Sequence, residues 1–145
     1  MVVSREEKMM TINYSNEKYI DKERLESLYN DVEWYAYTDD LELLQQAIEQ
    51  SLYVLTACEG DKLVGLIRVV GDGLTIIYIQ DILVLKEYQN QGIATEMLQH
   101  VLNKYENVRQ KVLLTDEAPD VRHFYEKNGF ESCDKGELVA FANLN

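Results

Sequence analysis

The chain has little of several things that would place it in a specialised structural class. One proline and seven glycines among 145 residues exclude a collagen-like repeat and give no sign of a flexible linker. Two cysteines, Cys58 and Cys133, lie far apart and outside any CxxC pair, so we expect free thiols rather than a disulfide. His100 and His123 lack the spacing of metal ligands, so we expect no metal site.

Basic residues and long apolar runs are also scarce. The chain has 14 Lys and Arg against 26 Asp and Glu, and its net charge of −12 argues against binding nucleic acid or an anionic membrane. The same charge is compatible with a cationic substrate. No apolar run approaches the roughly 18 residues of a spanning helix. We expect a cytoplasmic protein of one domain, residues 1–145, in which residues 1–10 are a flexible N-terminus.

Hydrophobic periodicity divides the chain into two halves. The first half predicts two helices followed by an antiparallel meander, because apolar residues recur first at helical spacing and then in strand-like runs. In the second half, apolar runs alternate with helical stripes, which indicates a right-handed crossover between two parallel strands. The expected helices are 20–30, one capped by Thr38 or Asp39, 91–105 and one opening at Pro119; the expected strands are 52–58, 62–70, 74–85, 111–115, 130–134 and 137–143.

The stretch QNQGIAT, residues 89–95, joins the long strand 74–85 to the helix 91–105 and is unusually polar for a short turn. A helix N-terminus presents unpaired N–H groups and a partial positive charge, and a glycine lets a phosphate approach them closely. Gly92 lacks a Cβ at this point, Ala94 is small and Thr95 adds a hydroxyl. No GxxxxGK[ST] or GxGxxG pattern is present, which argues against a P-loop or a dinucleotide fold.

Two motifs resemble those of the GNAT superfamily of N-acetyltransferases. QNQGIA fits that family's pyrophosphate motif, Q/R-x-x-G-x-G/A, and FYEKNGF (124–130) is similar to its second signature, with one helix and one strand between them. The resemblance covers about residues 50–135. Lys86 replaces a frequent proline, Ala94 a frequent glycine, and Asn90 and Gln91 replace frequent glycine or basic residues, which shifts the phosphate contacts towards backbone groups.

The resemblance implies an α/β (α+β) fold with a mixed, mostly antiparallel sheet of six to seven strands and about four helices. It implies acetyl-CoA as co-substrate, bound where strands 74–85 and 111–115 splay apart. The resemblance also implies that a primary amine attacks the acetyl group directly, in a ternary complex. The residues implied to bind the coenzyme are Ile82, Leu83, Val84, Gln89, Asn90, Gln91, Gly92, Ile93, Ala94, Thr95 and Tyr125.

Three residues are candidates for proton transfer. The resemblance places Tyr125 where the family has a tyrosine that protonates the leaving thiolate; otherwise it is a packing residue. Asp81 lies in an apolar strand, where a carboxylate must be paired, solvated or used, so it is either a general base or a structural hydrogen-bond acceptor. Asp116 follows the next strand and is either a second base candidate or a cap for the following helix.

Three aromatic residues, Trp34, Tyr35 and Tyr37, lie where this family builds the wall that faces the acceptor; the alternative is a loop packed onto the core. The region resembles the small arylalkylamine/serotonin-type branch of the superfamily, which implies a small, aromatic amine as acceptor. The alternatives are a protein or peptide N-acetyltransferase, or a catalytically silent coenzyme A-binding module. The sequence leaves the oligomeric state open between monomer and homodimer.

Overall fold

A computed structural model describes residues 11–145, so the expectation for residues 1–10 lies outside the described part of the chain. The chain forms two compact units, the first ending at Leu113 and the second running from Leu114 to Asn145. The first unit contains the sheet and most of the helices. Within it the described elements are β1 (Asn13–Ser15), α1 (Lys22–Asp31), α2 (Tyr35–Thr38), α3 (Leu41–Glu49), β2 (Tyr53–Glu59), β3 (Lys62–Gly71), β4 (Ile76–Val84), a 3-10 turn η2 (Lys86–Tyr88), α4 (Ile93–Lys104) and β5 (Gln110–Leu113).

The sheet has five strands in the order β1-β2-β3-β4-β5. The first three neighbouring pairs are antiparallel, and β4 and β5 are parallel, as the crossover through α4 requires. The expected parallel pair is therefore confirmed. Of the described strands, β5 pairs only with β4.

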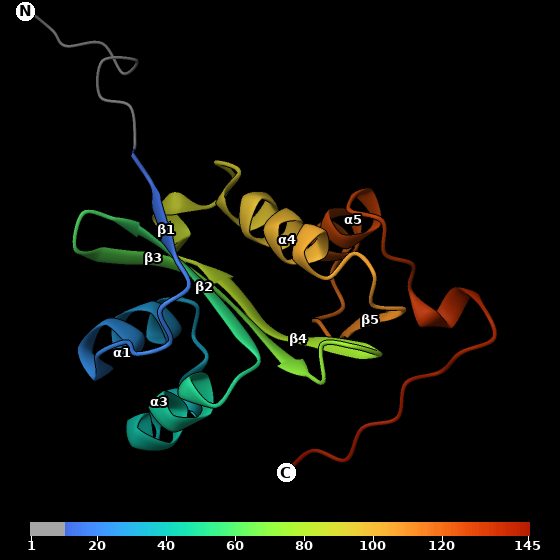
Figure 1. The fold of residues 1–145 in the computed structure, drawn as a ribbon, viewed down its shortest axis with the longest axis horizontal. Helices are drawn as coiled ribbons and strands as arrows, with labels where there is room; N and C mark the ends of the chain where they lie inside the picture. Colours follow the sequence, from blue (N-terminus) through green and yellow to red (C-terminus); the bar gives the residue numbers. More distant parts are fainter. Residues whose placement is uncertain (1–10) are drawn as a thin grey trace, which may run out of the picture. The chain divides into compact units, whose positions relative to one another are not determined.

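Helices cover both faces of the sheet, with α1 and α3 on one side and α4 on the other (Figure 1). Both faces of β3 are therefore buried, and its central residues 63–69 all belong to the buried part of the unit. A strand buried on both faces reads as a continuous apolar run, and KLVGLIRVV is one with a single interior charge. Gly65 lies under α4, and a Cβ there would come within 3.2 Å of Met97.

Aspartates begin the two N-terminal helices and close the turn before β4. The Asp21 carboxylate accepts the Arg24 N–H at the start of α1, and Asp40 accepts the Leu43 N–H at the start of α3. The cap of α3 is thus Asp40, one residue after the expected Asp39. Asp72 accepts three consecutive backbone N–H groups, from residues 74 to 76, which fixes the turn between β3 and β4.

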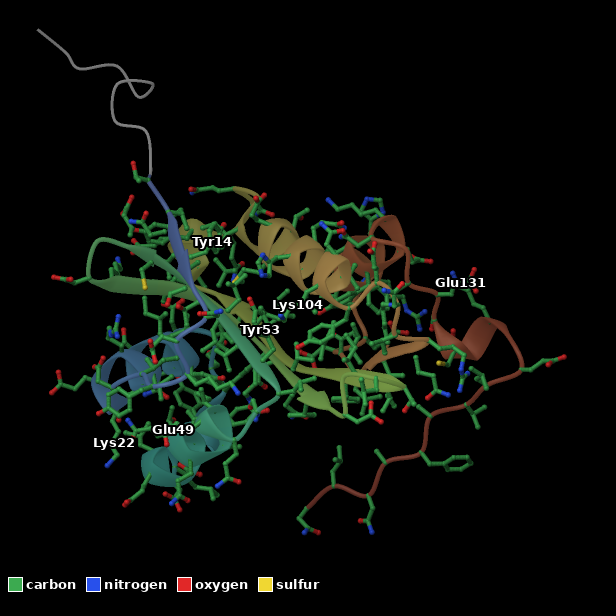
Figure 2. All side chains as sticks on the ribbon, viewed as in Figure 1. Tyr14, Lys22, Glu49, Tyr53, Lys104 and Glu131 are labelled. Atoms are coloured by element: carbon green, nitrogen blue, oxygen red, sulfur yellow. The ribbon has the colours of Figure 1, made fainter. Side chains whose placement is uncertain are left out.

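The α4 face of β2 carries a small aromatic cluster around Tyr53. The imidazole of His100 stacks on the Tyr53 ring at 5.8 Å between centroids, and the ammonium of Lys104 lies 4.9 Å above it. Both partners project from α4 towards β2, and Figure 2 labels Tyr53 and Lys104 at this contact. These contacts add a cation–π attraction to the packing of α4 on the sheet.

The second unit contains α5 (Pro119–Lys127) and a 3-10 turn, η3 (Cys133–Lys135). Proline stands in the first turn of α5, and Gly129 follows the helix with a φ of +92°, as expected. The prediction of strands at 130–134 and 137–143 is wrong, because the described residues there form no strand. A strand needs a hydrogen-bonding partner, and no described residue of this unit supplies one.

The observed sheet therefore has five strands where six to seven were expected. The four expected helices are present to within two or three residues at either end, and α2 is a short additional one. β1 was not expected; it is three residues long and all three are exposed, so it carries no alternating pattern. No helix of residues 11–145 is both long and apolar enough to cross a membrane.

Gly71 should be the least replaceable glycine of the sheet. Its φ is +128°, and an added Cβ would lie 2.6 Å from the Ile76 carbonyl oxygen, across the β3–β4 turn. We expect Gly71→Ala to lower the free energy of unfolding by about 2–4 kcal/mol in urea titrations, from strain plus overlap. Gly60→Ala is the control, because its φ is +59° but the space around it is open. Equal losses in both variants would contradict the overlap argument.

Candidate active site

The edge of β4 becomes free halfway along the strand. Opposite β3, Arg68 pairs with Asp81 and Val69 pairs with Ile79, so Gln80 is an extra, bulged residue. The parallel pairing with β5 covers only Ile76 to Ile79 and ends just before the bulge. From Gln80 to Val84, β4 thus presents peptide groups that no described strand pairs with on that side. The pairing stops at Leu113, where β5 ends, and the splay expected between these strands stays a prediction.

The turn after β4 ends in an open helix N-terminus. Asn90 and Gly92 adopt left-handed conformations, with φ of +64° and +88°, and Gly92 is the N-cap of α4. It provides no side-chain cap, and the first intrahelical bond runs from the Glu96 N–H to the Gly92 carbonyl. The N–H groups of residues 93–95 therefore precede the helical ladder and point out of the helix end.

Side chains hold this turn in place from three directions. The Gln89 amide donates to the Val84 carbonyl at 3.0 Å, which ties the turn to the end of β4. The Lys86 N–H donates to the Asp31 carboxylate at 2.7 Å, at the end of α1. The Tyr88 hydroxyl donates to Glu59 in the β2–β3 hairpin. The helix end is therefore preorganised before any ligand arrives, which lowers the entropic cost of binding.

These features fit the diphosphate and the extended arm of coenzyme A. Open N–H groups and the helix dipole suit an anion, and no atom lies within 4 Å of a Cβ built at Gly92, so the space beside this helix end is open. An unpaired strand edge suits an extended, amide-bearing chain. The predicted coenzyme residues Ile82, Leu83 and Val84 lie on that edge, and residues 89–95 lie on the turn and helix end.

Asp81 lies at the centre of a buried polar cluster. Its side chain is 1% exposed and forms an ion pair with Arg68, from Nε to Oδ2, at 2.7 Å. The Tyr29 hydroxyl donates to Oδ2 at 2.9 Å, and the Tyr37 hydroxyl donates to Oδ1 at 2.6 Å. Gln80 in turn donates its amide to the Tyr37 oxygen at 2.9 Å. The carboxylate is thus paired and hydrogen-bonded on both oxygens.

Burial and the charges in this cluster raise the pKa values of the neighbouring phenols and of the guanidinium. Burial and the Asp81 charge raise the pKa of Tyr29 well above its usual value, and they raise the pKa of Tyr37 as well. Burial opposes the charge on Arg68, but the adjacent carboxylate outweighs it and raises the pKa of the guanidinium. Both phenols therefore stay protonated and act as donors to a charged carboxylate.

This geometry favours the structural role that was set beside the catalytic one for Asp81. A general base must reach the proton that it removes, and the two Asp81 oxygens already accept three donors while buried. Tyr37 is the half-exposed member of the cluster. Through it, the buried carboxylate contacts the segment that contains the predicted acceptor residues.

In that segment, Trp34–Thr38, two aromatic rings pack against each other and against Tyr29. Trp34 and Tyr37 have ring centroids 6.1 Å apart, and each also meets the edge of the Tyr29 ring. Tyr35 points outward and is 54% exposed. The structure thus brings Trp34 and Tyr37 together with Asp81, whereas Tyr35 stands apart from them.

The other two predicted catalytic residues belong to the second unit. Tyr125 is buried, with its ring against Phe124 and Phe130, and burial raises its pKa to about 12. Its phenol is therefore protonated at neutral pH. Asp116 is exposed in the connection before α5, whose N-cap is Ala118 without a side-chain hydrogen bond. The capping role considered for Asp116 is thus not observed.

Two members of the buried cluster, Arg68 and Tyr29, were not anticipated. Arg68 is the only charge inside the apolar run of β3, and a buried strand carrying one positive charge beside a strand carrying one negative charge signals a cross-strand pair. That signal was available in the sequence. The bulge that sets Asp81 opposite Arg68 was not.

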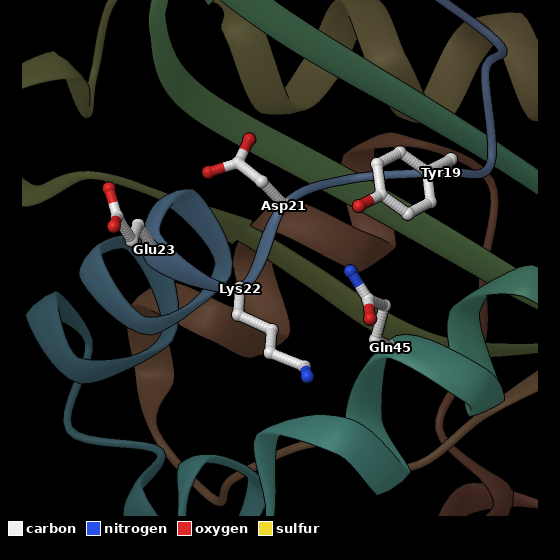
Figure 3. A pocket seen from close by; sticks show the side chains of 5 residues that line it. All are labelled: Tyr19, Asp21, Lys22, Glu23 and Gln45. Atoms are coloured by element: carbon white, nitrogen blue, oxygen red, sulfur yellow. The ribbon is translucent and has the colours of Figure 1, made fainter.

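A shallow hollow of about 380 Å³ lies elsewhere on the first unit, where the start of α1 meets α3 (Figure 3). Tyr19, Asp21, Lys22 and Glu23 line it from the α1 side, and Gln45 lines it from α3. Gln45 already donates to the Ile20 carbonyl at 2.7 Å, and Asp21 pairs with Arg24. None of the predicted site residues borders this hollow, so we do not assign it to the active site.

A five-stranded mixed sheet with one parallel pair, a bulged central strand and an open helix end places the chain among the mixed α/β proteins. Comparison with known proteins makes the assignment specific. Residues 11–142 match the family model described as "Acetyltransferase (GNAT) domain". This chain belongs to the GNAT family of N-acetyltransferases, an acyltransferase family that uses acetyl-CoA.

Individual relatives agree with this assignment. An uncharacterised ycf52-like N-acetyltransferase from Prochlorococcus marinus is 28% identical over 141 residues, covering 93% of this chain and 76% of its own length. A GNAT-family acetyltransferase structure from Streptococcus pneumoniae superimposes with a TM-score of 0.82 at 32% identity, covering 93% of this chain and 98% of that one. A probable acetyltransferase from Staphylococcus aureus gives a TM-score of 0.72 at 25% identity, covering 91% and 100%.

Breaking the buried ion pair from one side should destabilise the protein strongly. We expect Asp81→Asn to lower the free energy of unfolding by about 3–5 kcal/mol, because Arg68 keeps a buried charge without its counter-ion. The double variant Arg68→Met/Asp81→Asn removes that charge and should recover part of the loss. Urea unfolding of the two single variants and the double variant measures the coupling. Additive losses would show that the two side chains do not interact.

Proposed function

We propose that this chain transfers the acetyl group of acetyl-CoA to a primary amine, and that the acceptor is a small amine with an aromatic or apolar substituent. The observation that carries the proposal is the free edge of β4 from Gln80 to Val84, which leads directly into the open N-terminus of α4. One continuous stretch of the chain thereby offers peptide groups for an extended arm and N–H donors for a diphosphate.

Acetyl-CoA, when bound, supplies a thioester whose acetyl group an amine can attack. The chain's own contribution on this side is mainly backbone. Peptide groups of Ile82, Leu83 and Val84 would orient the arm, and an N–H near the bulge would donate to the carbonyl oxygen as negative charge develops there. The N–H groups of Ile93, Ala94 and Thr95 would hold the phosphates.

Two proton transfers remain for side chains. Tyr125 is our candidate for the general acid, because its raised pKa keeps the phenol protonated and able to donate to a departing thiolate. For the base, Asp116 is a better candidate than Asp81. Asp116 is exposed and caps no helix, whereas both Asp81 oxygens already accept hydrogen bonds. A primary ammonium with a pKa of about 10 must lose a proton before it can attack.

The proposed acceptor follows from the rings of Trp34 and Tyr37 beside the β4 bulge. Half-buried aromatic faces favour a flat or apolar group, which agrees with the resemblance to the arylalkylamine branch. A peptide N-terminus is the main alternative, and a silent coenzyme A-binding module is the second. Turnover measurements separate all three.

A panel assay tests the activity directly. We expect release of coenzyme A thiol from acetyl-CoA with 2-phenylethylamine or another arylalkylamine, and little with peptides. The panel also includes spermidine and sisomicin; sisomicin is bound in the structure of an aminoglycoside acetyltransferase that is similar to this chain with a TM-score of 0.63. Tyr125→Phe should lower kcat roughly 10²- to 10⁴-fold with the KM for acetyl-CoA unchanged. Tight coenzyme A binding without any turnover would instead support the silent module.

Gly92 should matter for the coenzyme rather than for folding. We expect Gly92→Val to weaken coenzyme A binding in calorimetric titrations by at least roughly tenfold, because the side chain fills the space in front of the α4 N–H groups. Gly60→Val is the matched control. It carries the same kind of left-handed strain in open space, but it lies in the β2–β3 hairpin. Comparable weakening in both variants would remove the case for a phosphate cradle at Gly92.

A further inference from the structure

The segment that carries Trp34 and Tyr37 has little stability of its own. Its helix, α2, is four residues long, has no buried residue and lacks a side-chain cap at its N-terminus. A single helical turn gains too few hydrogen bonds to offset the entropy of fixing it. Contacts with the rest of the first unit must therefore hold this segment in place.

Tyr37 provides the link to the sheet. Its hydroxyl donates to Asp81 at 2.6 Å and accepts from the Gln80 amide at 2.9 Å, so it bonds both the bulged residue and its neighbour. The guanidinium of Arg68 lies 6.0 Å from the centre of the same ring. A second bond, from the Thr38 hydroxyl to Asn30 at 2.6 Å, ties the segment to α1 but does not reach β4.

The acceptor of the Tyr37 bond cannot move. Arg68, 6% exposed, holds Asp81 from β3, and Tyr29, fully buried in α1, holds the same oxygen from the other side. The remaining oxygen of Asp81 is left for Tyr37. The direction of the Tyr37 ring, and with it that of the adjacent Trp34 ring, is therefore set by a buried ion pair that does not itself reach the surface.

We propose that Arg68 and Asp81 are positioning residues for the acceptor: through Tyr37 they hold the Trp34–Tyr37 ring pair over the β4 bulge and so determine which amines are accepted. The inference rests on the proposed acetyl transfer, because the bulge borders the free edge assigned to the coenzyme arm. It assigns the cluster to acceptor selection. It gives the cluster no part in proton transfer or in holding the coenzyme.

Tyr37→Phe and Tyr29→Phe form a matched pair that tests this role. Each removes one hydroxyl from the same carboxylate and keeps its ring, but only Tyr37 connects the carboxylate to the acceptor segment. With acetyl-CoA and 2-phenylethylamine, Tyr37→Phe should raise the KM for the amine roughly tenfold, the usual worth of a hydrogen bond to a charged group. The KM for acetyl-CoA should stay within about twofold. Tyr29→Phe should lower Tm and leave both KM values near wild type, because the Arg68 guanidinium still holds the same carboxylate oxygen.

A second readout does not depend on turnover. Trp34 is the single tryptophan of the chain, so its fluorescence reports the segment directly. Acrylamide quenching of Trp34 should increase about twofold in Tyr37→Phe, because the segment is released, and should stay unchanged in Tyr29→Phe. Gln80→Ala, which removes the other bond to the Tyr37 oxygen, should shift quenching and amine KM in the same direction by a smaller factor.

The inference fails if Tyr37→Phe leaves both amine KM and quenching at wild-type values. It also fails if Tyr29→Phe changes them as much as Tyr37→Phe, because the hydroxyls would then act through general packing. If wild type does not acetylate 2-phenylethylamine, the proposed acceptor class is wrong, and the quenching comparison still decides whether the cluster holds the segment. If Tyr37→Phe does not fold, Gln80→Ala decides by the same two measurements.

Discussion

The first unit is organised around the ion pair between Arg68 and Asp81, two charges that are almost completely removed from water. Neither could be buried alone, since an unpaired charge in an apolar interior costs several kcal/mol. The pair therefore requires β3 and β4 to meet in one register. The phenols of Tyr29 and Tyr37 supply the remaining hydrogen bonds, so α1 and the acceptor segment must dock where the carboxylate lies. The need to pair these two buried charges thus fixes the positions of β3, β4, α1 and the acceptor segment relative to one another.

The two sides of the site are built from different materials. On the side proposed for the coenzyme, the free groups belong to the backbone of β4 and of the α4 N-terminus, so conformation matters there more than side-chain identity. On the side proposed for the acceptor, ring faces form the surface, and a buried carboxylate holds one of them in place. Backbone groups are available whatever the side chain, which suits the departures at Asn90, Gln91 and Ala94 from the phosphate motif. A ring face depends on the identity of its residue.

The sequence predicted most of the architecture, because hydrophobic periodicity depends on local spacing alone. The order strand, helix, strand predicted the parallel pair through the crossover rule, and Gly92 in a polar junction predicted the glycine turn. The sequence did not predict the Arg68 partner of Asp81, since pairing across strands depends on a bulge that no local pattern marks. Two C-terminal strands were expected from apolar content, and Leu138 and Phe141 are instead 70% and 92% exposed. Strand propensity becomes a strand only where a partner edge exists.

The bulge at Gln80 is one extra residue in an otherwise regular strand, and it decides which residue lies opposite Arg68. If β4 paired regularly with β3 from Ile79 onwards, Gln80 would lie opposite Arg68 and Asp81 opposite Ile67. The buried guanidinium would then face an amide across the strands instead of its counter-ion. One irregular residue thus allows two opposite charges to be buried together.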